Sequence, residues 1–192
     1  MKPTYSGFEA KKNSGFATLP PAGAYVAEIQ GVKVQDCPYN HGRDEIVCMV
    51  EITEGEYAGQ YHKVFEEQKN SFGGDIKYKG TISLMPPVDG DEPWVRGRFE
   101  GALWCVEQSN PGYHWDWDET KLKGKKVGIN IRNRIYYGRD GSEKTTTEIG
   151  QFETVQDVRD GKVKPLKDRL PKNKPEAEQN FTDVSGDVEV PF

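Results

Sequence analysis

Hydrophobic and polar side chains alternate along five stretches of the chain, which is the pattern that half-buried β-strands produce. The alternation predicts strands over residues 24–34, 45–53, 60–67, 125–137 and 143–152. In the first stretch the apolar phase changes at Gly31, which makes this glycine a candidate β-bulge. A turn at residues 138–141, with a glycine at each end, joins the last two stretches as a hairpin. The chain is therefore predicted to be mainly β.

One stretch has a helical period instead. In residues 94–108, apolar side chains recur every three or four positions, which predicts an amphipathic helix. We expect Trp94 and Trp104 to lie in the core with the apolar face of this helix. The preceding residues 68–93 are rich in Gly, Pro and Asp and are predicted to be a long loop insertion, although residues 78–85 are compatible with a short strand.

The predicted order is three strands, a helix and then a hairpin. This order is that of an OB fold, whereas a doubly wound sheet needs a helix between most of its strands. We therefore predict a five-stranded OB-fold (Greek-key) barrel, with one helix between strands 3 and 4, the long loop insertion and a disordered acidic tail.

Composition divides the chain into four segments. Residues 1–20 are predicted to be an N-terminal arm, residues 21–155 the OB-fold domain, residues 156–180 a basic, proline-containing linker, and residues 181–192 an acidic tail. No stretch is apolar enough to span a membrane, and the first residues lack the apolar core of a signal peptide, so we expect a cytoplasmic protein. Cys37, Cys48 and Cys105 form no C-x-x-C pair and are expected to be reduced thiols.

The net charge of −5 would by itself argue against a nucleic-acid partner, but the distribution of charge reverses that inference. Residues 176–192 contain five acidic side chains and no Lys or Arg, and subtracting those five from 31 leaves 26 acidic against 26 basic residues in residues 1–175. Within this neutral part, residues 121–147 carry eight Lys or Arg side chains and only two acids. A local basic stripe on a neutral domain suits contact with a phosphate backbone.

The last six residues combine acidic side chains with an apolar ending. They are Asp187, Val188, Glu189, Val190, Pro191 and Phe192. In such a peptide the Phe192 ring can enter an apolar pocket while the carboxylates meet basic residues around its rim. This ending resembles the acidic, Pro-Phe-terminated tip of bacterial and phage single-stranded DNA-binding proteins. The alternative is an ordinary acidic tail, which is common at chain ends.

Four segments of the body extend this resemblance to phage- or mobile-element-encoded single-stranded DNA-binding proteins. They are LPPAGAYVA at residues 19–27, EGEYAGQY at 54–61, LKGKKV at 122–127 and YYGRDG at 136–141. The resemblance implies an OB-fold body that binds single-stranded DNA during replication, recombination and repair in a bacterial host cell. It implies no catalysis and no cofactor or metal. A tip formed by Asp187, Glu189, Val190, Pro191 and Phe192 would recruit replication and recombination proteins. Self-association stays open, with a dimer favoured over a tetramer.

The fourth predicted strand offers both cations for phosphates and rings for bases. Its candidate DNA-binding residues, continued through the next turn, are Lys126, Asn130, Arg132, Arg134, Tyr136, Arg139 and Lys144. The alternative is a solvated outer face of an edge strand, where Lys and Arg discourage aggregation. The third predicted strand repeats the pattern with Tyr61, Lys63 and Phe65, although Phe65 also suits the core. Tyr39 and Arg43 lie in the loop between the first two strands, which is a DNA-gripping element in OB folds but is equally compatible with a mobile polar loop.

Two other function classes, a metal-dependent enzyme and a non-catalytic adaptor, are alternatives to DNA binding. Asp116, Asp118 and Glu119 could hold a divalent metal as in a nuclease, and Cys37 with His41 could bind zinc, but neither set is a complete ligand group on rigid elements. Trp115 and Trp117 lie among these acids, which repel phosphate, so we expect both rings to pack beneath the barrel, with stacking on bases as the alternative. The second alternative is a non-catalytic adaptor that uses its body for protein contacts. DNA binding should weaken steeply with added salt, whereas docking through apolar pockets should not.

Overall fold

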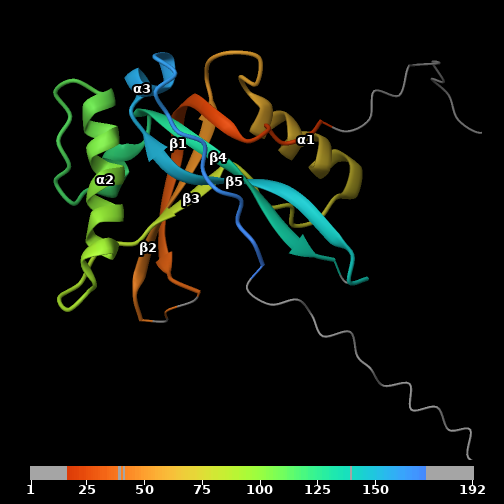
Figure 1. The fold of residues 1–192 in the computed structure, drawn as a ribbon, viewed down its shortest axis with the longest axis horizontal. Helices are drawn as coiled ribbons and strands as arrows, with labels where there is room; N and C mark the ends of the chain where they lie inside the picture. The colour runs from red at the N-terminus through yellow and green to blue at the C-terminus, as the bar shows by residue number, and fades with distance from the viewer. Residues whose placement is uncertain (1–16, 39, 41, 139, 172–192) are drawn as a thin grey trace, which may run out of the picture.

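The computed structural model describes residues 17–38, 40, 42–138 and 140–171. Five strands and three α-helices make up this part of the chain (Figure 1). In chain order they are β1 (Gly23–Asp36), β2 (Asp44–Ile52), α1 (Gln60–Phe72), β3 (Thr81–Leu84), α2 (Pro93–Ser109), a 3₁₀ turn (Glu119–Leu122), β4 (Lys126–Tyr137), β5 (Glu143–Glu153) and α3 (Val155–Arg159). The mainly β class, four of the five predicted strands and the predicted helix over residues 94–108 are confirmed.

The strands form one antiparallel sheet in the order β3-β2-β1-β4-β5. The long central strand β1 pairs with β4 over residues 23–28 and with β2 over residues 27–36. The register between β1 and β2 shifts between Ile29 and Gly31, which confirms the predicted bulge. The edge strands β3 and β5 approach each other, but no ladder joins them in the described part of the chain. The expected barrel is therefore not closed.

The prediction of a strand over residues 60–67 is wrong, because these residues begin helix α1. Gly59 precedes the helix in a left-handed turn with φ of 73°. The Glu51 carboxylate on β2 accepts hydrogen bonds from the N–H groups of Tyr61 (3.1 Å) and His62 (2.6 Å), which are unpaired donors of the first helical turn. Tyr61 and Val64, three residues apart, are the buried side chains of α1. This spacing puts both side chains on one face of a helix, whereas in a strand they would point to opposite faces, and the distant carboxylate supports the helix further.

The third strand of the sheet is instead β3, which lies inside the predicted loop insertion, within residues 78–85. Gly80 allows the chain to enter this strand close to β2. A Cβ atom at this position would lie 2.5 Å from the Val50 carbonyl oxygen and 2.8 Å from the Tyr61 ring. The Gly80 carbonyl in turn accepts a hydrogen bond from the Val50 N–H at 2.8 Å. A larger residue would separate β3 from both neighbours.

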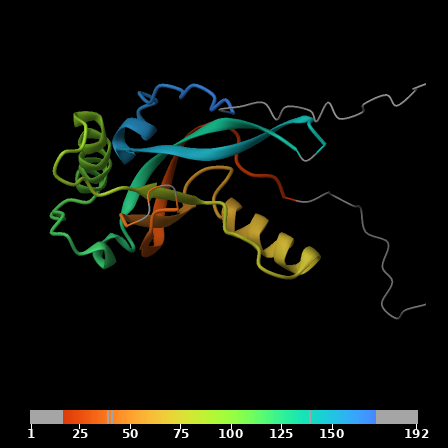
Figure 2. The ribbon, with the colours of Figure 1, turned by 90° about the horizontal axis from the view of Figure 1, so that it is seen from below.

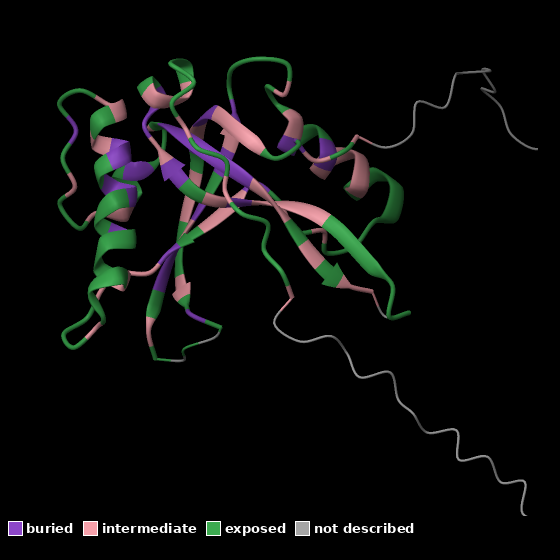
Figure 3. Ribbon diagram, in the orientation of Figure 1, coloured by how far each residue is buried: buried purple, intermediate pink, exposed green. Residues whose placement is uncertain are grey.

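The hydrophobic core lies between the sheet and one face of α2 (Figure 3). Helix α2 contributes Phe99, Ala102, Leu103, Cys105 and Val106 to it. Trp94 and Trp104 each lie five residues from Phe99, which turns them about 140° away from it around the helix. They are 64% and 54% exposed, so the prediction that they belong to the core is wrong.

The three cysteines are free, as predicted, and all three are buried. Burial raises the pKa of the Cys48 thiol to about 12 and that of Cys105 to about 11, so both are neutral thiols that pack as small apolar groups.

Residues 155–171 pack on the outer side of the β4–β5 hairpin, as Figures 1 and 2 both show. Arg169 forms a parallel bridge with β4, donating its N–H to the Asn133 carbonyl (2.8 Å) and accepting from the Ile135 N–H (2.9 Å). A Cβ at Gly128 would lie 2.6 Å from Val158, and one at Gly150 would lie 2.4 Å from Leu166. The described part of the expected linker therefore belongs to the folded body.

No helix among the described residues combines the length and the apolarity that crossing a membrane requires.

The role of Glu51 can be tested by substitution. Its carboxylate accepts from two N–H groups of α1 and from the Tyr78 hydroxyl at 2.8 Å. We expect Glu51→Ala to lower the free energy of unfolding by about 1–3 kcal/mol, because these partners lose their acceptor. Glu51→Gln retains one acceptor oxygen and should lose less. Urea denaturation measures both, and equal stabilities of Glu51→Ala and the parent protein would contradict the assignment.

Candidate nucleic-acid interface

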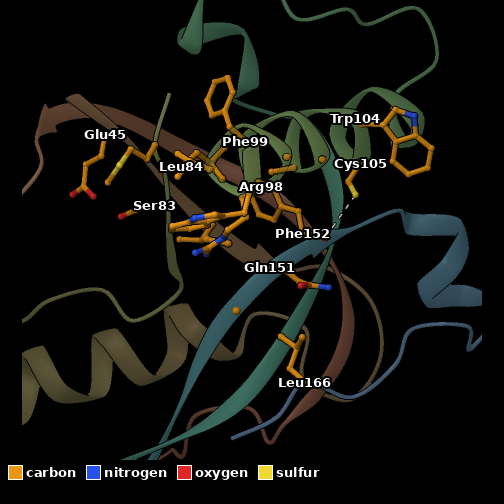
Figure 4. A pocket seen from close by; sticks show the side chains of 18 of the residues that line it. Glu45, Ser83, Leu84, Arg98, Phe99, Trp104, Cys105, Gln151, Phe152 and Leu166 are labelled. Carbon is orange, nitrogen blue, oxygen red and sulfur yellow. Dashed lines mark hydrogen bonds between the residues drawn. The ribbon is translucent and has the colours of Figure 1, made fainter. Parts of the chain in front are cut away.

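A groove of about 800 Å³ lies between α2, the end of β3 and the edge strand β5 (Figure 4). Its floor and walls are largely apolar, with Leu84, Phe99, Phe152 and Leu166 among the lining side chains. The exposed Trp94 and Trp104 rings also line it, and so do two guanidinium groups, those of Arg98 and Arg132. Two flat rings and two cations therefore share one groove.

Small residues keep this groove open. Gly97 and Gly101 on α2 line it, and a Cβ on either would meet no atom within 4 Å. On the opposite wall, β5 bulges at Gly150, where the register with β4 shifts. Glycine inside a helix costs roughly 1 kcal/mol relative to alanine. The two helical glycines therefore leave open space beside α2 and lower the stability of the helix.

Beyond the groove, one carboxylate is shared by three arginines. Glu148 on β5 faces Arg132 across the β4–β5 ladder. Its oxygens lie 2.8 Å from the Arg132 guanidinium, 3.7 Å from Arg134 and 3.3 Å from Arg169. The three guanidinium groups carry three positive charges and the carboxylate carries one negative charge, so the cluster has an excess of two positive charges. Because Arg134 and Arg169 are half-exposed, this excess faces solvent.

Arg132 belongs both to the groove and to the group of arginines around Glu148. Its side chain lines the groove and also pairs with Glu148, so the groove and the arginine cluster (Arg132, Arg134 and Arg169 around Glu148) form a continuous surface. Tyr136 follows Arg134 on the same face of β4 and is exposed, and Lys144 pairs with it in the ladder and is also exposed. Four of the predicted DNA-binding residues are therefore brought together here.

Other predicted contacts of β4 lie elsewhere. Asn130 is fully buried, and its side-chain amide donates to Glu153 (3.1 Å) and to the Lys164 carbonyl (2.9 Å). Its assignment to DNA is corrected, because the C-terminal segment covers this part of the strand. Lys126 is exposed but lies at the far end of β4, beside Asn110, which accepts its backbone N–H at 3.0 Å.

The residues predicted on a third strand do not extend this surface, because α1 and α2 lie at opposite ends of the sheet (Figures 1 and 2). Tyr61 is 2% exposed and belongs to the core, so its assignment to DNA is corrected. Burial raises the pKa of its hydroxyl. Lys63 is exposed on α1, and the partly buried Phe65 ring packs edge-on against Tyr78 at 5.8 Å.

Arg43 is held in an ion pair with Asp91, and this corrects its assignment to a DNA-gripping loop. Its guanidinium also donates to the Pro86 carbonyl at 2.9 Å, and the side chain is 14% exposed. The hydrogen bonds from Arg43 lower the pKa of Asp91, which keeps the pair charged. The pair ties the β1–β2 loop to the segment before α2. Tyr39, Arg139 and the tip residues Asp187, Glu189, Val190, Pro191 and Phe192 lie outside the described residues.

Trp94, Arg98 and Trp104 were not predicted to be surface residues. A signal was present in the sequence, because Gly97 and Gly101, which are poor helix formers, lie between the two tryptophans of the predicted helix. Helical glycines beside aromatic and basic residues indicate a face kept open for another molecule.

The acidic clusters considered for metal binding have other partners. Across the described part of the chain, no group of three or more His, Cys, Asp or Glu side chains is placed to hold a metal ion. Asp116 and Asp118 both pair with Lys121, and its hydrogen bond lowers the pKa of Asp116.

Comparison with known proteins returned no matching family model and no matching curated protein.

Glu148 should stabilise the fold by neutralising the arginine cluster. We expect Glu148→Gln to lower the free energy of unfolding by about 1–2 kcal/mol at low ionic strength, because three guanidiniums then face one another without a counter-charge. The loss should shrink as salt screens this repulsion. Glu143→Gln, the same change at an exposed position of β5, is the control in urea denaturation at two salt concentrations. A loss that does not depend on salt would contradict the charge argument.

Proposed function

We propose that this protein binds single-stranded DNA without sequence preference and without catalysis, in DNA replication or recombination. The strand would occupy the groove beside α2 and continue along the arginine cluster. The observation that carries this proposal is the pairing of exposed Trp94 and Trp104 rings with Arg98 and Arg132 in one groove. Proteins that hold single strands combine rings on which bases stack with cations that follow the phosphates.

The exposure of the two rings supports a ligand of this kind. A large aromatic side chain that stays more than half exposed loses most of the free energy that burial would provide. Each base that stacks on such a ring contributes roughly 1–3 kcal/mol to binding. A strand in the groove would cover the rings and recover that contribution.

The local charge supports the same ligand. Arg98 and the arginine cluster line the proposed path, against Glu148 and the buried Glu45, whose carboxylate accepts from Gln35 at 2.8 Å. This surface is therefore positive although the chain as a whole is negative. Arginine contacts phosphate and also stacks on bases, so it suits an unpaired strand better than lysine does.

The topology is compatible with the proposed family. The order β3-β2-β1-β4-β5, with α2 between β3 and β4, is the order of an OB barrel opened between its third and fifth strands. We propose that the body is such an open OB-like barrel and that the strand enters through the opening. Self-association, with a dimer favoured, stays a prediction.

The apolar lining of the groove favours one alternative, a non-catalytic adaptor that docks a peptide there. Leu84, Phe99, Phe152 and Leu166 would suit an apolar segment of a partner protein. Ionic strength separates the two functions, because release of counterions makes strand binding fall steeply with salt.

The strand path can be tested by titrating labelled homopolymeric DNA and RNA at two salt concentrations. We expect Trp104→Leu to weaken DNA binding by roughly 1–3 kcal/mol with an unchanged salt slope, because it removes a stacking surface. Arg98→Gln should lower the magnitude of the slope by about one, because it removes one phosphate contact. Trp117→Leu, an exposed tryptophan outside the groove, is the control. Folded groove variants that bind like the parent protein would refute this path.

Recruitment of replication and recombination proteins by Asp187, Glu189, Val190, Pro191 and Phe192 is proposed from the sequence alone. We expect Phe192→Ala to abolish capture of such proteins from a bacterial lysate while leaving DNA affinity unchanged, because it removes an apolar anchor and no side-chain charge. Thr182→Ala in the same segment is the control. Mass spectrometry of captured proteins measures the loss, and unchanged capture by Phe192→Ala would exclude a role for this ring.

A further inference from the structure

A second cavity, of about 250 Å³, lies on the other side of α2 from the groove. Its lining includes four aromatic rings and two carboxylates, from Phe99, Trp104, Trp115, Trp117, Glu100 and Glu107. No Lys or Arg is among the described residues that line it. We propose that this aromatic pocket binds a basic side chain, Arg or Lys, from a partner protein.

The rings of the aromatic pocket are held at fixed angles by one another. Phe99 stacks on Trp117 with 5.9 Å between ring centroids and meets Trp115 nearly edge-on at 6.3 Å. Trp115 and Trp117 are tilted by 56° at 6.1 Å. Phe99 is buried and Trp115 packs against the core, so the inner rings are anchored in the fold. A wall of this kind presents ring faces without further ordering, which lowers the entropic cost of binding.

Trp117 is the exposed ring of this wall, so the expectation that it packs beneath the barrel is wrong. It is 67% exposed, and its φ of 67° makes it the single non-glycine residue with positive φ in the described part of the chain. This backbone conformation is disfavoured for a bulky side chain, and exposure forgoes the burial that a tryptophan ring would otherwise gain. Strained backbone of this kind is concentrated at binding sites.

The charge around the aromatic pocket favours a cation. The Glu107 carboxylate accepts a hydrogen bond from the backbone N–H of Trp115 at 2.8 Å and lies 3.7 Å from His114, while Glu100 is exposed at the rim. A cation over a tryptophan face is attracted by the ring and, here, by two carboxylates. The same carboxylates repel phosphate, so a nucleic-acid strand is disfavoured.

Helix α2 thus separates two surfaces of opposite charge. The groove on one side holds Arg98 and Arg132, and the aromatic pocket on the other holds Glu100 and Glu107. Trp104 lines both. Charge complementarity therefore assigns an anionic ligand to the groove and a basic protein segment to the aromatic pocket. The inference does not depend on the groove binding DNA.

The aromatic pocket can be tested on the full chain with a pair of synthetic peptides. One peptide carries two arginines between glycines, and its control replaces each arginine with citrulline, which has the same shape without the charge. Two-dimensional NMR of the tryptophan indole N–H groups reports where each peptide binds. We expect the arginine peptide to shift the Trp104, Trp115 and Trp117 signals and the citrulline peptide to leave them in place.

Two variants test which groups of the aromatic pocket bind the arginine side chain. Trp117→Leu should weaken binding of the arginine peptide about tenfold, since it removes the exposed ring face. Glu100→Gln should weaken it several-fold with little risk to folding, because this side chain is exposed. Trp94→Leu, which alters only the groove, should leave peptide affinity unchanged while weakening any DNA binding.

The peptide experiment separates a cation site for a partner protein from two other outcomes, binding without regard to charge and occupation of the aromatic pocket by this chain itself. Equal binding of both peptides, or unchanged affinity in Glu100→Gln, would overturn the cation site. Indole signals that move only after residues 172–192 are deleted would show that this chain fills its own pocket, which would overturn the assignment to a partner. Loss of DNA binding by groove variants, with peptide binding intact, would support the groove and the aromatic pocket as separate sites.

Discussion

A bulge in the central strand β1 sets the curvature of the whole sheet. This strand pairs with β4 over residues 23–28 and with β2 over residues 27–36, and the bulge between Ile29 and Gly31 bends it near its middle. The sheet therefore curves until its edges, β3 and β5, approach each other without pairing. Helix α2 covers this opening, and the groove exists because the helix does not fill it.

The C-terminal segment decides which part of β4 remains available. Residues 155–171 cover the first half of β4 and bury Asn130, whose side-chain amide donates a hydrogen bond to this segment. Farther along, Arg169 joins Arg132 and Arg134 around Glu148, so the segment adds a cation to the surface that it borders. A single carboxylate pairs with three arginines and leaves positive charge facing solvent. This excess charge contributes little to the stability of the fold and favours the binding of an anion.

Helix α2 has three faces with different roles. Its buried stripe, which includes Phe99, Leu103 and Val106, anchors it to the sheet. The glycine-bearing face opens the groove with its arginines, and the face with Glu100 and Glu107 borders the aromatic pocket. Because these surfaces share one rigid element, a ligand on either contacts the same core residue, Phe99.

The alternation of apolar and polar residues correctly predicted the long strands β1, β2, β4 and β5, because alternation over nine or more residues is specific to a sheet with one buried face, but it did not establish the four-residue strand β3. The sequence also showed the basic stripe that contains Arg132 and Arg134. It could not distinguish a strand from a helix at Tyr61, where the carboxylate of Glu51, ten residues earlier, decides the outcome. Nor could it show that Trp94 and Trp104 are exposed, or that Asn130 is buried. These features follow from the packing of distant segments, because the burial of a side chain depends on which surface another segment covers.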